Sequence, residues 1–160
     1  MHIDKHEILS LMINQLRADL SVCEQAVKIA RDTATHADAQ GSSRYETMGL
    51  EASYLAQGQG LRLLEVERSL AYFMQLKLPA STGSIGLSSL IVLRDEQGDE
   101  QLLWLAADAG GMKIQYADTT ITVITPKSPL GAALIGKAAG DELDISIAGV
   151  ERYYEVCTVY

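Results

Sequence analysis

Few residues in this chain have the types and spacing that support chemistry. His2 and His6 lie four residues apart, which could hold a metal ion on one helix face, but no Cys or Glu completes a convincing ligand set. Cys23 and Cys157 stand in different halves of the chain and form neither a metal-ligand spacing nor a redox pair. No Ser/His/Asp or Cys/His arrangement stands out, and no phosphate-binding glycine loop is present. We therefore expect neither a cofactor of its own nor stand-alone catalysis.

The charge of the chain bears on its partners. The formal net charge is −8, and residues 79–160 carry −6 of it, with five Lys and Arg against eleven Asp and Glu. Contacts to nucleic-acid phosphates need clustered basic residues, so we expect no independent nucleic-acid binding. A protein partner with a basic face suits the acidic half better, although acidity also serves solubility.

Two smaller sets of residues allow two interpretations each. Four basic residues of the first half could form a strip facing RNA or a solvated helix surface: Lys28, Arg31, Arg44 and Arg62. Tyr153 and Tyr154 are expected to pack the last strand rather than to bind a ligand.

The first half predicts two long helices that pack against each other. Apolar residues recur in steps of four and three, the heptad pattern of paired helices, at Leu9, Ile13, Leu16, Leu20, Cys23, Val27, Ala30 and Ala34. Residues 36–43 break the pattern with Gly, Ser and Asp, which predicts a turn within 36–44. A second helix follows over 45–76, with an apolar side that includes Met48, Leu55, Leu63 and Val66. Gly58 and Gly60 weaken its middle and indicate either close helix contact or a bend.

The second half predicts short strands with glycine turns. The chain has a small-residue linker over 79–88 and then strands near 90–93, 102–106, 114–116, 120–125, 143–147 and 153–159. Ser128 suits a helix N-cap, Pro129 the first helical position and Gly136 the end, so one short helix, apolar nearly all round, should be buried against the sheet. The expected fold is α+β: an antiparallel helical hairpin over 1–78 and an antiparallel β domain over 89–160.

The location and assembly of the chain can also be predicted. No apolar signal-peptide stretch opens the sequence, and no run approaches the ~18 uninterrupted apolar residues of a membrane span. We expect a cytoplasmic protein without membrane contact. An intramolecular hairpin satisfies its own heptads, so we expect a monomer.

The segment over 128–141 (Ser-Pro-Leu-Gly-Ala-Ala-Leu-Ile-Gly-Lys-Ala-Ala-Gly-Asp) resembles the C-terminal signature of the Gre family of bacterial transcription elongation factors. The order of hairpin, linker and β domain is also that of the family. The resemblance implies a C-terminal domain similar to the FK506-binding proteins. It makes five signature residues candidates for binding a partner: Ser128, Pro129, Leu130, Gly140 and Asp141.

The partner that the resemblance implies is RNA polymerase. In the family, the C-terminal domain docks at the rim of the polymerase secondary channel and the hairpin enters the channel. Acidic residues at the hairpin tip help to hold a second Mg²⁺ in the polymerase active site. Two metals clamp the attacking water and the leaving oxygen, so the factor stimulates RNA cleavage by the polymerase and is not an enzyme itself.

The hairpin tip departs from the family pattern, which typically reads Gly-Asp-x-x-Glu-Asn-x-Glu-Tyr. When the sequences are aligned on Tyr45, Asp38 falls on the first acid, Gly41 on the second acid and Ser42 on the Asn. Asp38 is the candidate for contact with the catalytic metal, or it is a turn residue that bonds its own backbone. Because one carboxylate orients a metal less well than two, we expect weak or no stimulation of cleavage.

Two other functions are alternatives for this sequence. A fold like the FK506-binding proteins suggests a prolyl isomerase or chaperone, which needs an aromatic-lined pocket, and the second half offers Trp104 and Tyr116 among its aromatic residues. A coiled-coil adaptor is the other alternative.

Overall fold

The computed structural model describes residues 2–40 and 43–160, with the side chains at 34, 36–40, 43–49, 52 and 53 outside the description. The chain divides into two compact units. We name them the sheet unit (Met1–Leu11 and Leu76–Tyr160) and the hairpin unit (Met12–Gln75). Among the described residues, no helix has both the length and the apolar character needed to cross a membrane.

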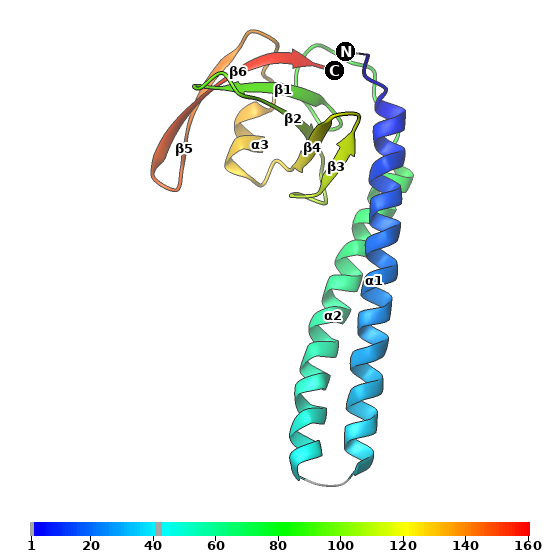
Figure 1. Ribbon diagram of the computed structural model, residues 1–160. Coiled ribbons are helices and arrows are strands. Elements are labelled where there is room, and N and C mark those ends of the chain that lie inside the picture. The colour runs from blue at the N-terminus through cyan, green and yellow to red at the C-terminus, as the bar shows by residue number, and fades with distance from the viewer. Residues whose placement is uncertain (1, 41–42) are drawn as a thin grey trace. The chain divides into compact units, whose positions relative to one another are not determined.

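Six strands form one sheet in the sheet unit (Figure 1). They are β1 (Leu90–Asp95), β2 (Glu100–Leu105), β3 (Lys113–Tyr116), β4 (Thr119–Ile124), β5 (Glu142–Ile147) and β6 (Val150–Val159). The strand order across the sheet is β3-β4-β2-β1-β6-β5. The predicted polar turn between β1 and β2 is present, and Asp95 Oδ1 accepts hydrogen bonds at 2.9 Å from the backbone N–H groups of Gln97 and Asp99.

One pairing in the sheet differs from the predicted antiparallel arrangement. β2 and β4 run parallel, with Leu102 opposite Ile121 and Leu105 opposite Ile124. The other four pairings are antiparallel. The chain places β3 at the sheet edge and then returns β4 between β3 and β2, so β4 takes the direction of β2. The α+β class is confirmed, and the sheet is mixed.

The main core lies between one face of the sheet and the short helix α3 (Pro129–Leu134). Its buried members are Ile85, Ile91, Leu93, Leu103, Leu105, Leu134, Leu143 and Val156. The predicted Ser128 cap is confirmed, and α3 packs against the core as predicted, with Leu134 buried and Leu130 and Ala133 partly buried. Ile135, directly after α3, is 49% exposed, because only one side of such a short helix can meet the sheet.

The opposite face of the sheet is covered by the start of the chain. Trp104 lies between Leu103 and Leu105 along β2, so it points away from the main core, and it is fully buried. The Lys5 ammonium lies 5.3 Å from the centre of the Trp104 ring and donates a hydrogen bond to the Tyr160 carbonyl at 3.2 Å. Burial lowers the pKa of Lys5. These contacts explain why the first residues belong to the sheet unit.

The predicted helix pair is formed by α1 (Lys5–Gln40) and α2 (Ser43–Gln75), which lie side by side in Figure 1. α1 ends at Gln40 and α2 begins at Ser43, within the range predicted for the turn, but α1 continues through residues 36–40, where the helix pattern was expected to break. That segment holds Ala and Gln, which favour helices, and the strongest breaker, Gly41, comes after it.

The buried positions of α1 agree with the predicted heptad at Leu16, Cys23, Val27 and Ala30 and differ from it nearer the start of the helix. They are Ile8, Met12, Leu16, Cys23, Val27 and Ala30, whereas Leu9, Ile13 and Leu20 are half-buried. From Ile8 to Ala30 the buried positions span two repeats of eleven residues. An eleven-residue repeat follows a helix of 3.6 residues per turn more closely than a strict heptad does.

Candidate functional site

The hairpin tip is the first candidate region. The backbone at Asp38 is helical and belongs to the last turn of α1, so the interpretation of Asp38 as a turn residue is wrong. The Asp38 side chain lies outside the description, as do Gly41 and Ser42 entirely. A role of Asp38 in metal contact therefore stays a prediction.

The second candidate region is the start of α3, where the sequence signature begins. The Ser128 hydroxyl accepts a hydrogen bond from the Gly131 N–H at 3.0 Å and donates one to the Thr125 carbonyl at 2.8 Å. Pro129 occupies the first helical turn and is exposed, while Leu130 packs against the main core. Ser128 and Leu130 therefore hold the local fold, and Pro129 is the exposed one of the three candidates at this turn.

Gly131 is a structural requirement that the sequence analysis did not single out. A Cβ atom at this position would lie 2.0 Å from the Thr125 carbonyl oxygen and 2.7 Å from the carbonyl carbon. No side chain fits there unless the backbone moves. The glycine lets the chain entering α3 pass directly over its first turn, and this is why the signature has Gly three residues after the capping Ser.

Gly140 and Asp141 form a separate turn before β5. Asp141 Oδ2 accepts a hydrogen bond from the Ala138 N–H at 2.8 Å, and the Asp141 carbonyl accepts one from the Val156 N–H at 2.8 Å. Gly140 has φ +92° and donates to the Val156 carbonyl at 2.7 Å. Within the part of the chain that the structure describes, no hydrogen bond joins this turn to the start of α3. The five candidate residues thus lie at two separate positions on the sheet unit.

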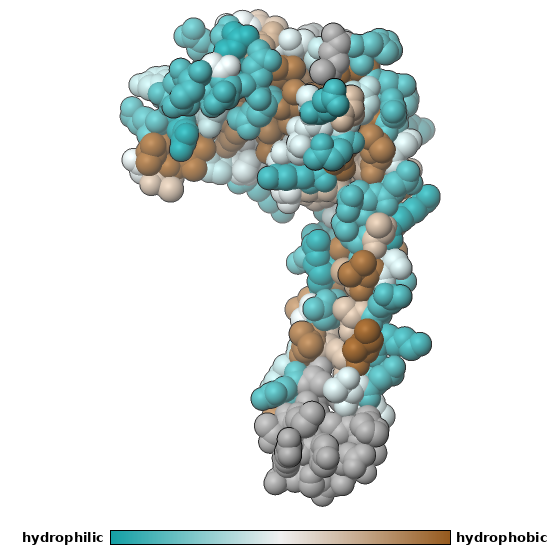
Figure 2. Space-filling model, viewed as in Figure 1, coloured by the Kyte–Doolittle hydropathy of each residue, from teal (hydrophilic) through white to brown (hydrophobic). Residues whose placement is uncertain are grey.

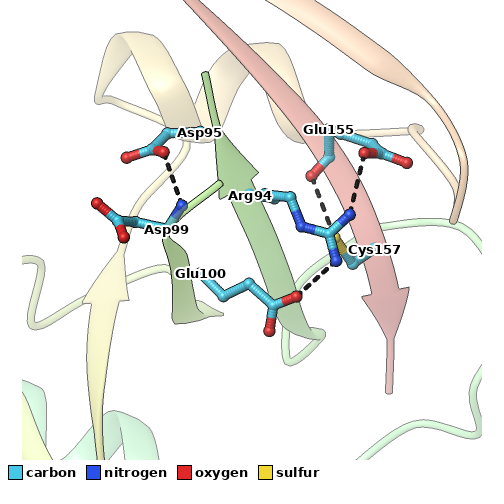
Figure 3. A network of polar contacts seen from close by, with 6 residues as sticks. All are labelled: Arg94, Asp95, Asp99, Glu100, Glu155 and Cys157. Carbon is cyan, nitrogen blue, oxygen red and sulfur yellow. Dashed lines mark hydrogen bonds and ion pairs between the residues drawn. The ribbon is translucent and has the colours of Figure 1, made fainter. Parts of the chain in front are cut away.

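A third region, on β1, β2, β5 and β6, was not predicted from the sequence. Figure 3 shows the Arg94 guanidinium between two carboxylates, 2.7 Å from Glu100 and 3.4 Å from Glu155. The sheet register places both acids directly opposite Arg94 on the neighbouring strands. The hydrogen bond from Arg94 to Glu100 is the main cause that raises the pKa of Arg94.

Beside this network lies an acidic hollow of about 460 Å³. It is lined by Arg94, Asp95, Glu96, Glu142, Leu143, Asp144, Tyr153, Tyr154 and Glu155. Tyr153 is 50% exposed, so the expectation that it packs the last strand is wrong, whereas Tyr154 does pack against the main core. The negative charge of Asp144, followed by that of Glu151, raises the pKa of Tyr153. The hollow suits a basic group of a partner better than an apolar ligand.

The aromatic residues bear on the isomerase alternative. Trp104 is fully buried, its indole N–H has no hydrogen-bond partner among the described residues, and its ring is covered by Lys5. Tyr116 is buried, and its hydroxyl accepts a hydrogen bond from the Asp4 N–H at 3.1 Å. Neither ring is free to line an open pocket, so the arrangement gives the isomerase alternative no support.

The remaining candidates are dispersed. The described residues contain no group of three or more His, Cys, Asp or Glu side chains placed to hold a metal ion. Arg62 pairs with Glu65 at 3.4 Å on α2. Lys28 and Arg31 lie on α1, and the Arg44 side chain is outside the description, so a basic strip facing RNA stays a prediction.

The C-terminal half of the chain matches a known protein family. Residues 80–160 match the family model described as the C-terminal part of the transcription elongation factors GreA and GreB. The match begins just after α2 and includes the whole sheet together with α3.

Relatives extend the similarity into the hairpin. The chain is 26% identical over 133 residues to transcription elongation factor GreA of Cereibacter sphaeroides, covering 83% of this chain and 82% of that protein. It is 25% identical over 155 residues to GreA of Chlorobaculum tepidum, covering 96% and 89%. Among solved structures, GreA factor homolog 1 of Thermus thermophilus has a TM-score of 0.39 at 19% identity, covering 94% of this chain and 95% of that one. The chain belongs to the GreA/GreB family of transcription elongation factors.

Proposed function

We propose that this elongation factor binds RNA polymerase, with the sheet unit docked at the rim of the secondary channel and the hairpin inserted into it. The observation that carries the proposal is the match of residues 80–160 to the family, which includes the whole signature. The dimensions of the helices suit an inserted probe, because the 36 residues of α1 span about 54 Å at 1.5 Å per residue. The acidic character of the chain favours a protein partner over nucleic acid alone.

The docking surface on the sheet unit includes the start of α3. Ser128 and Gly131 keep this turn rigid through short contacts with Thr125. Pro129 is exposed directly between them and is presented in one fixed orientation. A rigid, exposed proline needs little ordering when a partner covers it, which favours binding.

The hairpin tip supports a factor that promotes cleavage weakly or not at all. Asp38 is the one acid at a position matched to the family pattern, and Gly41 takes the place of the second. A carboxylate in the last turn of a helix lies at the negative end of the helix dipole, so Asp38 does not serve to stabilise α1. Asp38 remains available to touch Mg²⁺ in the polymerase active site. The factor acts mainly by occupying the channel.

Docking is tested by competition with a cleavage-stimulating factor for polymerase. Pro129→Glu changes the exposed surface but leaves the Ser128 cap intact, and an acid is favourable in a first helical turn. We expect a loss of affinity of about tenfold or more. Val150→Gln, an exposed site on β6, serves as the control and keeps full competition. Failure of the unaltered chain to compete at all would exclude the proposal.

The mechanism is tested on backtracked elongation complexes. We expect little RNA shortening by the unaltered protein and more by Gly41→Glu, which supplies the second acid. Ser42→Glu, one position away, is the matched control and should not raise cleavage, because a displacement of about 1 Å can lower a rate ~10²-fold. Asp38→Ala should leave polymerase binding nearly intact. Strong cleavage by the unaltered protein that Asp38→Ala abolishes would show that one carboxylate suffices.

A further inference from the structure

The hairpin unit exposes large apolar side chains along much of its length. They are Val22, Ile29, Leu50, Tyr54, Leu55, Leu61, Leu64 and Met74. Figure 2 shows brown, apolar side chains on both helices of the hairpin on the visible face. Four of those on α2, at positions 50, 54, 61 and 64, follow steps of four, seven and three. This spacing is that of a second heptad seam, separate from the one that packs α1 on α2, and a heptad seam fits another helix.

The centre of this seam is a groove of about 610 Å³ within the hairpin unit. It is lined by Arg31, Ala56, Gln57, Gly60, Leu61, Leu63, Leu64 and Glu67. Leu61 is 66% exposed and Leu64 is 60% exposed. A Cβ atom at Gly60 would meet no atom within 4 Å, so the glycine does not serve close contact between α1 and α2. It leaves space for an atom from outside.

The two charged residues of the groove stand toward opposite ends. Arg31 lies nine residues before the end of α1, so it is level with about residue 52, nine residues after the start of the antiparallel α2. Glu67 is some fifteen residues further along, roughly 20 Å at 1.5 Å per residue. Neither side chain forms an ion pair with another described residue. Among the described residues, the groove thus has an unpaired positive charge at one end and an unpaired negative charge at the other.

We propose that this groove binds the same groove of a second copy of the chain, in an antiparallel arrangement with a two-fold axis near Gly60. A surface with opposite charges at its two ends complements itself when it is rotated by half a turn, so Arg31 of each copy faces Glu67 of the other. The same rotation places Leu61 against the space at Gly60, and Leu64 against Ala56. Large side chains thus meet small ones on both sides of the axis.

The resulting contact between four helices covers the exposed leucines of both hairpin units. The sheet unit needs no such partner. The dimer departs from the monomer that the intramolecular hairpin predicts. One consequence rests on the proposed function. If the hairpin enters the polymerase channel, the dimer buries the surface that would insert, so dimerisation competes with channel binding. Self-association itself is tested without polymerase, so its failure is distinct from failure of the proposed function.

Sedimentation equilibrium of the full chain over a dilution series measures the association. We expect a concentration-dependent dimer whose dissociation constant rises at least a hundredfold in Leu61→Glu, because a central apolar contact is lost from both copies. Arg31→Glu or Glu67→Arg alone should raise it about tenfold, since each places like charges opposite each other at both ends. The double variant Arg31→Glu/Glu67→Arg reverses both ends and should restore association.

Val150→Glu in the sheet unit is the matched control, with an exposed apolar residue replaced by the same acid, and should leave the dimer unchanged. Circular dichroism shows that each variant keeps its helices. A chain that stays monomeric at every concentration overturns the proposal. Dimers that survive Leu61→Glu, or a double variant that does not recover, also overturn it. Loss of polymerase binding in Leu61→Glu by a strictly monomeric chain would assign the groove to polymerase instead.

Discussion

The sheet unit and the hairpin unit treat their apolar residues differently. In the sheet unit, residues of β1, β2, β4, β5 and β6 pack around α3 on one face, and Trp104 is covered by Lys5 on the other. In the hairpin unit, two helices can cover only one side of each other, and leucines such as Leu61 and Leu64 stay exposed. A sheet covered on both faces completes its own core, whereas an isolated pair of helices leaves apolar surface for a partner.

The same contrast separates residues that serve folding from residues that serve binding. In the sheet unit, the signature residues Ser128, Gly131 and Asp141 are engaged by local backbone contacts, so most of the signature is explained by the fold. In the hairpin unit, the exposed leucines and the open side of Gly60 have no packing partner among the described residues. Substitutions should therefore change stability mainly in the first set and binding mainly in the second.

The largest effect is expected at Gly131. Gly131→Ala forces a Cβ atom to within 2.0 Å of the Thr125 carbonyl oxygen, so the turn before α3 must open. We expect a loss of roughly 3 kcal/mol in the free energy of unfolding of the sheet unit, measured by chemical denaturation. Ala132→Gly, at the neighbouring exposed position of α3, is the control and should cost about 1 kcal/mol or less. A fully stable Gly131→Ala protein would mean that the chain passes α3 at a greater distance.

A smaller loss is expected at the helix cap in the same unit. Ser128→Ala removes both the acceptor for the Gly131 N–H and the donor to the Thr125 carbonyl, and should lower the free energy of unfolding by about 1 kcal/mol. Ser128→Asp keeps the acceptor and should recover part of the loss. Equal stabilities of the Ala and Asp variants in thermal unfolding would contradict the capping role.

These two positions show what the sequence could and could not predict. Ser128, Pro129 and Gly136 have local roles at helix ends, so their types and spacing predicted α3 correctly. The need for Gly131 depends on where the preceding strand passes over α3, and that is a tertiary contact. The parallel pairing of β2 and β4 also escaped prediction, because the strand pattern is the same for either direction. Ile85, which is buried in the main core, lies in a segment whose composition predicted only a linker.

On the hairpin, periodicity identified the two helices but not their outer surface. Leu55 was expected on the apolar side of α2, yet it is 57% exposed, while Val66 from the same predicted set is buried. Because α2 carries apolar residues on two sides, one seam could not be separated from the other by spacing alone. The tip acid Asp38 was found only by resemblance, since a single carboxylate has no spacing to recognise.

The third effect has the opposite sign. Gly58→Ala adds a Cβ atom on α2 where no atom lies within 4 Å, and alanine favours helix more than glycine does. We expect the hairpin unit to gain up to ~1 kcal/mol, again measured by chemical denaturation. The same Gly→Ala change thus destabilises one unit and stabilises the other. A loss of stability at Gly58 would indicate a bend in α2 that alanine does not tolerate.

The smallest effect is expected at Leu64, and it tests the comparison between the units most directly. Leu64 is exposed on the outer seam, and Leu and Gln have similar helix propensities, so Leu64→Gln should change the free energy of unfolding by less than about 0.5 kcal/mol. The measurement needs a concentration at which the chain is monomeric, because burial in a dimer would add to the apparent stability. Val66→Ala, two residues further along α2 but buried against α1, is the control and should cost roughly 2 kcal/mol. A large loss at Leu64 in the dilute monomer would mean that the leucine is covered by its own chain, and the distinction between a closed sheet unit and an open hairpin would fail.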